Sequence, residues 1–130
     1  MNGATSSNSN PSEVQGVCPD GWHVPSDEEW KELEMFLGMS RDTADAVGYR
    51  GPDIGSMLAS SPEGWEDGYL DSNPAFGSSG FNAKPGGGRR FDGTFDHKGK
   101  NANFWTATEY SNLRAWGRHI YSKYSSVHRY

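Results

Sequence analysis

The segment SDEEWKELEMFLG, residues 26–38, most constrains the fold of this chain. Ser26 and Glu29 have the spacing of a capping box, in which each side chain satisfies a free backbone N–H at the start of a helix. Trp30 and Leu33 begin an apolar stripe at helical spacing, and Gly38 is suited to end a helix. The pattern therefore predicts an amphipathic helix over residues 27–37.

Most of the remaining chain favours turns and short strands, because its 130 residues include 17 Gly and 7 Pro. A second, shorter helix is expected over residues 40–48, beginning at Ser40. RRFDGTF predicts a hairpin that turns at Asp92-Gly93. NANFWTATE and RAWGRHIY predict two strands, and SVHRY the start of another. We expect a single α+β domain with early helices and late strands.

The charges of the chain are unevenly placed. Residues 101–130 hold four basic residues and one acidic residue, whereas residues 1–100 hold eight basic and sixteen acidic residues. The basic C-terminal part would either meet an acidic ligand or pair with carboxylates of the acidic part. The basic residues are too few to favour a nucleic acid partner.

Several classes of site are disfavoured. Cys18 is the single cysteine, so the chain has neither an internal disulfide nor a cysteine-based zinc cluster. The spacing of Asp92, Asp96 and Asn101 fits no EF-hand, and PGGGRR lacks the Lys-Ser/Thr of a P-loop. No local signature marks a catalytic nucleophile. We expect no metal, no cofactor and no catalysis.

The N-terminal sequence MNGATSSNSNPSE lacks the basic and apolar regions of a signal peptide. No apolar run in the chain approaches the length of a membrane span. Residues 1–16 are rich in Ser and Asn, and we expect them to be a flexible lead-in to a domain over residues 17–130.

Four sequence blocks occur in a distinctive order: CPDGWHVPSDEEW, GFNAKPGG, FWTATE and AWGR. Together they resemble the Fibrobacter succinogenes major paralogous domain, which occurs in surface proteins and lipoproteins of gut and rumen bacteria. The resemblance covers about residues 2–129. It implies a C-type-lectin-like fold with a small twisted antiparallel sheet, two helices and long irregular loops. It also implies a cell-surface or extracellular location.

The chain departs from this family at its end. Members usually continue into a final strand whose Cys can pair with the counterpart of Cys18, whereas this sequence stops at Tyr130. The resemblance therefore implies that the domain lacks its last strand. Unpaired sheet edges would then make oligomers possible.

The C-terminal segment divides into two sets of positions. Those that match the family blocks are Phe104, Trp105, Thr108, Glu109, Ala115, Trp116, Arg118, Ile120, Val127 and Arg129. The positions between them are rich in Tyr, Ser and Asn, the composition typical of antibody paratopes. Along RAWGRHIY, the two-residue period places Gly117, His119 and Tyr121 on one face of a strand.

The predicted ligand-binding residues are Tyr110, Ser111, Asn112, Arg114, His119, Tyr121, Tyr124 and His128. We expect Tyr110, Arg114, His119, Tyr121 and Tyr124 to be exposed on one surface. Trp105, Trp116 and Ile120 should be mostly buried, as should most of the five Trp. Alternatively, the polar residues between the family blocks are simply solvated.

Three functions remain open. The first is a non-enzymatic module of a bacterial surface or phage-associated protein that binds a protein or a glycan. The second is the hypervariable protein of a diversity-generating retroelement, which uses the same face. The third is an enzyme similar to the formylglycine-generating enzymes, which contain a stretch resembling HVPSDEEW but rely on cysteines that coordinate copper.

Overall fold

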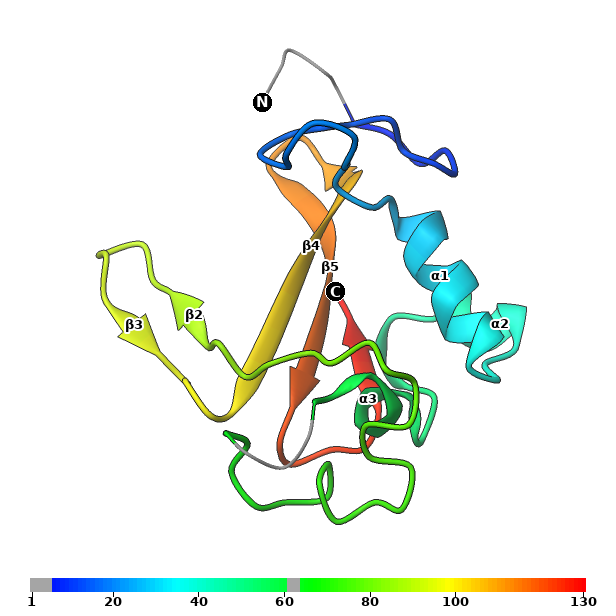
Figure 1. The fold of residues 1–130 in the computed structure, drawn as a ribbon. Coiled ribbons are helices and arrows are strands. Elements are labelled where there is room, and N and C mark those ends of the chain that lie inside the picture. Colours follow the sequence, from blue (N-terminus) through cyan, green and yellow to red (C-terminus); the bar gives the residue numbers. More distant parts are fainter. Residues whose placement is uncertain (1–5, 61–63) are drawn as a thin grey trace.

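The computed structural model describes residues 6–60 and 64–130. Within them, the chain forms a small α+β domain, as predicted (Figure 1). The elements in order are α1 (Asp27–Phe36), α2 (Arg41–Asp45), β1 (Gly48–Arg50), α3 (Ile54–Leu58), β2 (Gly88–Arg89), β3 (Phe95–Asp96), β4 (Asn101–Ser111), β5 (Arg114–Tyr121) and β6 (Val127–Arg129). Among the described residues, no helix is both long and apolar enough to cross a membrane.

Helix α1 begins with the predicted capping box. The Ser26 hydroxyl accepts a hydrogen bond from the Glu29 N–H at 3.1 Å, and the Glu29 carboxylate accepts one from the Ser26 N–H at 2.8 Å. The second predicted helix begins at its Ser40 cap but ends at Asp45. It is shorter than expected because residues 48–50 form strand β1 instead.

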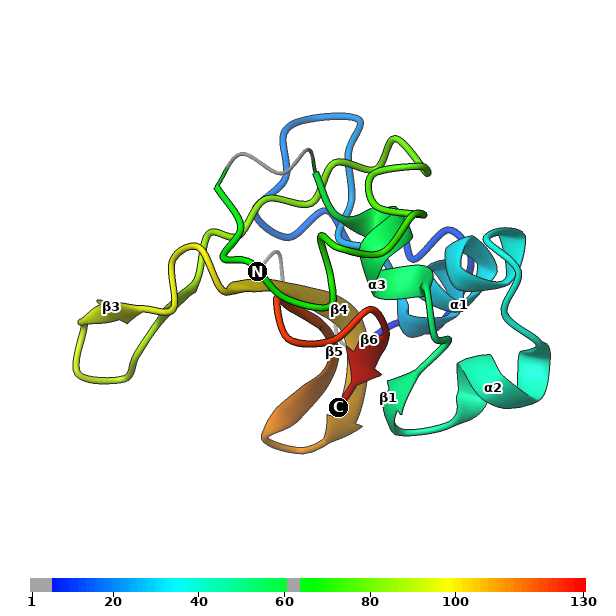
Figure 2. The ribbon, with the colours of Figure 1, turned by 90° about the horizontal axis from the view of Figure 1, so that it is seen from below.

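The main sheet has four antiparallel strands in the order β1-β6-β5-β4. The predicted strands β4 and β5 form a long hairpin, and β6 lies between β5 and β1 rather than at an edge. Helices α1 and α3 lie on the same side of this sheet (Figure 2).

Strands β2 and β3 form a separate small hairpin that projects from the body (Figure 1). Its turn is the predicted one, but only Gly93 has a positive φ, of 88°. The Asp92 carboxylate instead accepts hydrogen bonds from the N–H and the hydroxyl of Thr94.

We call the side of the main sheet that packs on α1 the inner face. It contributes Ala102, Ile120 and Val127 to the hydrophobic core, and Trp30 of α1 packs there with 4% of its surface exposed. The prediction that Ile120 is buried is confirmed.

The inner face also carries a buried ion-pair network. The Arg118 guanidinium, which has no exposed surface, donates to Glu34 at 2.7 Å and to Asp27 at 2.8 Å. Arg129 donates to Asp27 at 2.8 Å, and Arg50 donates to Glu34 at 2.6 Å. Arg118 and Arg129 of the basic C-terminal part therefore pair with carboxylates of the acidic part, which is the second of the two alternatives given above.

Burial alone would raise the pKa of the Asp27 carboxyl. The hydrogen bonds and charges of Arg129 and Arg118 outweigh burial and hold this pKa well below its usual range. Asp27 is therefore ionised at neutral pH and is part of the fold rather than of a ligand site.

The described part of the lead-in expected over residues 1–16, residues 6–16, contacts the domain at several points. Ser7 N–H donates to the Ala107 carbonyl at 3.0 Å, and Val24 N–H donates to the Val14 carbonyl at 2.8 Å. Ser12 and Val14 are buried. These contacts attach residues 6–16 to β4 and to the chain before α1.

Candidate functional site: the outer face of the sheet

The side of the main sheet turned away from α1 is called here the outer face. Its residues are Tyr49, Asn101, Asn103, Trp105, Gly117, His119, Tyr121, His128 and Tyr130, as the strand register and the two-residue period require. One row crosses all four strands, because Tyr49 lies opposite His128, His128 opposite His119, and His119 opposite Asn103. Helices α1 and α3 both lie on the opposite side of the sheet (Figure 2).

The aromatic rings of this face form a continuous layer. Tyr49 contacts His128 and Tyr124, with ring centroids 4.6 and 4.4 Å apart. Tyr124, from the β5–β6 connection, contacts Tyr121 at 5.7 Å, and Tyr121 stacks on His119 at 5.9 Å. Neighbouring rings thereby hold one another in place on the sheet.

The layer continues over Gly117 toward the β4 edge. A Cβ atom on Gly117 would lie 2.9 Å from the ring of Tyr130, so glycine makes room for this ring. Tyr130 in turn contacts His128 at 5.6 Å and Trp105 at 6.3 Å.

The prediction that Trp105 is buried is wrong, because 63% of its surface is exposed. Trp105 lies opposite Gly117 and therefore shares the outer face with it. Its neighbour Phe104 points to the inner face and packs on Trp30 at 5.2 Å.

The prediction that Trp116 is mostly buried is confirmed. Trp116 lies between the guanidinium of Arg129 at 3.5 Å and the ring of Tyr110 at 4.6 Å. Trp30 and Trp65 are buried, but Trp22 is 72% exposed. The expectation that most of the tryptophans are mostly buried is therefore confirmed for three of the five.

The two histidines of the outer face favour their neutral forms at neutral pH. Burial, with a contribution from His128, lowers the pKa of His119, and burial together with Arg50 lowers the pKa of His128. Burial and the neighbouring Tyr124 raise the pKa of Tyr49. The buried atoms His119 Nε2 and His128 Nδ1 have no hydrogen-bond partner within the described part of the chain.

The predicted binding residues fall into two groups. Tyr110, Ser111, Asn112 and Arg114 are exposed around the β4–β5 turn, as is Tyr124 at the other end of the layer. His119, Tyr121 and His128 lie within the layer and are only partly exposed. The expectation that His119 and Tyr121 are solvent-exposed is thus corrected, because their rings pack on neighbours and are partly buried.

A cavity of about 380 Å³ joins the turn to the layer. Trp105 and Tyr130 of the outer face line it together with Tyr110, Leu113, Arg114 and Ala115. Sequence reasoning missed Tyr49, Trp105 and Tyr130 as members of this surface. Tyr130 could have been found from its two-residue spacing to His128, whereas no local signal marks Tyr49.

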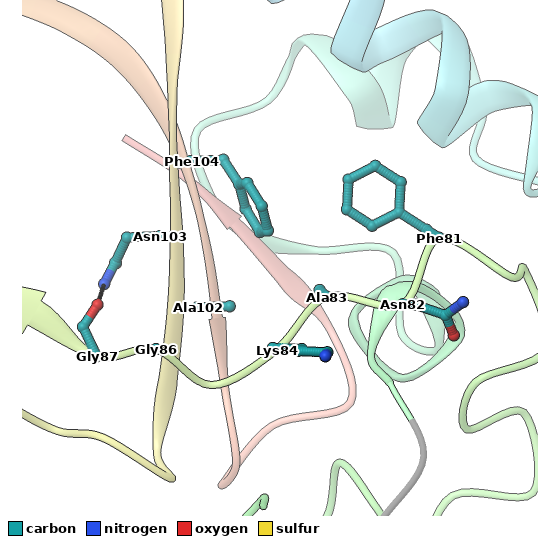
Figure 3. A pocket seen from close by; sticks show the side chains of 9 residues that line it. All are labelled: Phe81, Asn82, Ala83, Lys84, Gly86, Gly87, Ala102, Asn103 and Phe104. Carbon is teal, nitrogen blue, oxygen red and sulfur yellow. Dashed lines mark hydrogen bonds between the residues drawn. The ribbon is translucent and has the colours of Figure 1, made fainter.

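A second cavity, of about 430 Å³, lies where the GFNAKPGG motif crosses the start of β4 (Figure 3). The rings of Phe81 and Phe104 meet at 5.7 Å on its apolar side. Asn103 donates a hydrogen bond to the Gly87 carbonyl at 3.1 Å, and Asn82 has a positive φ of 60°. Lys84 also lines the cavity, and it forms no ion pair with any described residue.

Of the oxygen ligands considered for calcium, Asp92 and Asp96 are engaged within the β2–β3 hairpin, whereas the buried Asn101 Oδ1 has no hydrogen-bond partner among the described residues. The Asp96 carboxylate pairs with Arg90 and with His97. Among residues 6–60 and 64–130, no group of three His, Cys, Asp or Glu side chains is placed to hold a metal ion.

Comparison with known proteins gives one match. The family model described as Fibrobacter succinogenes major domain matches residues 5–130. No curated protein and no solved structure matches the chain.

Proposed function

This chain belongs to the Fibrobacter succinogenes major domain family, and we propose that it is a non-enzymatic module that binds a protein or a glycan through the outer face. The observation that carries the proposal is the continuous aromatic layer, from Tyr49 on β1 to Trp105 on β4, on the sheet side away from α1. Exposed aromatic patches of this kind mark interaction sites more often than they mark unused surface.

The chemistry of the face suits recognition rather than catalysis. Its two histidines favour their neutral forms, and Tyr supplies rigid contact area together with a hydroxyl that can donate or accept. The hydroxyls of Tyr49 and Tyr124 and the exposed polar residues of the β4–β5 turn would fix the orientation of a ligand. Rigid anchors reduce the entropy lost on binding.

The same proposal includes a C-type-lectin-like fold and a location at the cell surface or outside the cell. A small antiparallel sheet, early helices and the long irregular segment between α3 and β4 support the fold relation. The location rests on the family resemblance alone.

A second candidate uses the same face as the diversified surface of a retroelement's variable protein. The observation in its favour is that His119, Tyr121 and His128 lie on the outer face, whereas Arg118 and Arg129 hold the buried ion pairs. Substitution on one face would leave the other intact. A near-copy of the codons for this segment in the flanking DNA, differing mainly at adenines, would support this candidate over an invariant module.

The enzymatic alternative would require copper bound through cysteine, and Cys18 is the single cysteine of the chain. Oxygen uptake in the presence of a cysteine-containing peptide and copper would support the enzymatic alternative and would overturn the non-enzymatic proposal.

The test is a glycan and protein array probed with the wild-type domain and with two variants. Tyr124→Ala removes a ring of the layer that is 46% exposed, and Phe36→Ala removes an exposed aromatic ring from α1 as a control. The free energy of unfolding of both variants should lie within about 0.5 kcal/mol of the wild-type value, as is usual for surface substitutions. Tyr124→Ala should weaken binding to any ligand found by about 2 kcal/mol, whereas Phe36→Ala should not. Equal binding by all three proteins would refute the proposed face.

A further inference from the structure

Part of the free edge of the main sheet has unused backbone hydrogen-bonding groups. Strand β4 is the edge strand beside β5. Along it, the Asn101 carbonyl accepts from the Gly87 N–H at 2.8 Å, and further on Ala107 donates to Pro25 and accepts from Ser7. Both Asn101 and Ala107 therefore direct their backbone groups away from β5.

The strand register indicates that the backbone N–H and carbonyl of Asn103 and of Trp105 also point away from β5. Trp105 lies opposite Gly117, and Gly117 uses its own N–H and carbonyl to bond Tyr130 of β6. The pair of Trp105 with Gly117 is therefore a non-hydrogen-bonded pair of the β4–β5 ladder. The N–H and carbonyl of Asn103 and of Trp105 point out of the sheet, and they have no hydrogen-bond partner among residues 6–60 and 64–130.

The open stretch is short and is bounded at both ends. From Asn101 to Ala107, a strand extends about 20 Å. The segment ending at Gly87 covers its first end, and Ser7 and Pro25 cover its second end. The gap therefore has the length of a few extended residues.

These covering segments also disfavour pairing with a second copy. In a symmetric antiparallel pairing of two β4 edges centred on Phe104, residue 101 of one copy would lie opposite residue 107 of the other. The segment at Gly87 in one copy would then occupy the place of Ser7 and Pro25 in the other. A single slender strand avoids this collision.

A cavity lies beside each end of the open stretch, and the two differ in chemistry. The cavity of Figure 3 is lined by Asn103 and Phe104 of β4 and by Asn82 and Lys84. The other, of about 410 Å³, is bounded by Trp105 and Thr106 and is lined mainly by apolar residues such as Val17. The first suits an acidic or polar side chain, and the second an apolar one.

We propose that the β4 edge at Asn103–Trp105 binds an extended peptide of a partner protein by strand addition, with an acidic or polar side chain in the cavity at Lys84 and an apolar side chain in the cavity at Val17. In this mode, main-chain hydrogen bonds provide affinity and the flanking cavities provide sequence preference. The site shares Trp105 with the aromatic layer, but it uses the outward backbone groups of β4 rather than the rings of the outer face.

The experiment uses a phage-displayed library of random 12-residue peptides and the complete 130-residue chain. Selected peptides are synthesised, and amide hydrogen exchange is followed by NMR. The amides of Asn103 and Trp105 should exchange rapidly in the free protein and become protected when peptide is added. The selected sequences should pair an apolar residue with an acidic or polar one.

Two variants at one position separate the backbone from the side chain. Asn103→Pro removes the outward N–H without removing a bond of the β4–β5 ladder, as proline permits on an edge strand. Asn103→Ala removes the side chain but keeps the N–H. Asn103→Pro should lower the affinity for the peptide about tenfold or more, and Asn103→Ala should lower it about threefold at most. If Asn103→Pro does not fold, a peptide N-methylated along its central residues should show the same loss against the wild type.

Four outcomes would overturn the proposal. The first is an equal loss of peptide affinity in folded Asn103→Pro and Asn103→Ala, and the second is that no peptide is enriched from the library. The third is that the selected peptides leave the amides of Asn103 and Trp105 unprotected. The fourth is that protection of these amides rises with protein concentration alone, which would indicate a second copy at this edge. Tyr124→Ala should leave the peptide affinity unchanged, so that failure of this site is distinguishable from failure of the outer face.

Discussion

Replacing Arg118 by Met tests how far the buried ion-pair network supports the fold. Met keeps an unbranched apolar side chain at a position with no exposed surface but removes the guanidinium. Three hydrogen bonds to carboxylates are lost, at 2.7 and 3.4 Å to Glu34 and at 2.8 Å to Asp27.

The expected magnitude follows from what remains around the two carboxylates. Removing one partner of a buried ion pair costs about 3–5 kcal/mol. Asp27 keeps Arg129 at 2.8 Å, and Glu34 keeps Arg50 at 2.6 Å, so neither charge is left without a partner. We therefore expect Arg118→Met to lower the free energy of unfolding at pH 7 by about 3 kcal/mol, near the lower end of that range.

The cost should depend on pH in a defined direction. The pKa of Asp27 is held below its usual range in the folded protein, so this group contributes its full stabilisation above its unfolded pKa of about 4 and loses it progressively as pH falls from that value through the folded pKa. In the variant the pKa of Asp27 should lie closer to the unfolded value. The difference between wild type and variant should accordingly be smaller at pH 3.5 than at pH 7.

The assay is urea unfolding followed by circular dichroism at both pH values. Arg114→Met is the matched control, because Arg114 is exposed and forms no ion pair with the described residues. It should change stability by about 0.5 kcal/mol or less. If Arg118→Met is as stable as Arg114→Met at pH 7, or if its cost grows toward low pH, the reasoning about the network is wrong.

Three further changes test other parts of the structure. Ser26→Ala removes the α1 cap and should cost about 1 kcal/mol in urea unfolding; an unchanged midpoint would argue against the capping box. Since burial lowers the pKa of His119, the folded protein disfavours its protonated form and should lose stability as pH falls below about 6.5. His119→Gln should flatten that loss between pH 7 and pH 5, and an unaltered slope would exclude His119 as its source. Gly68→Ala would place a Cβ atom 2.0 Å from the Ser122 carbonyl oxygen, whereas Gly86→Ala meets nothing within 4 Å. The first variant should melt well below the second, and similar melting temperatures would contradict the packing at Gly68.

Local patterns were sufficient for the elements that short-range interactions determine. The capping box of α1 needs only Ser26 and Glu29, three residues apart, and the two-residue period of β5 is a property of any strand. The alternation correctly placed Gly117 and His119 on a different face from Arg118. The family blocks in the sequence likewise identified the family that the comparison shows.

The same patterns could not tell which aromatic side chains are exposed. Trp105 and Phe104 are adjacent and both aromatic, and only the register with β5 places Trp105 opposite Gly117 and on the outer face. An aromatic residue in a strand is compatible with either face, so composition alone misplaced Trp105 in the core.

The sequence by itself determined the α+β class, the start of α1, the strands of the C-terminal hairpin and the family. Only the tertiary structure decided that Arg118 neutralises carboxylates of α1, and that Tyr49 joins His128 in one aromatic layer. The physical reason is range. Caps, turns and strand periods depend on neighbours within a few residues, whereas ion pairing and burial depend on which distant segments the folded chain brings into contact.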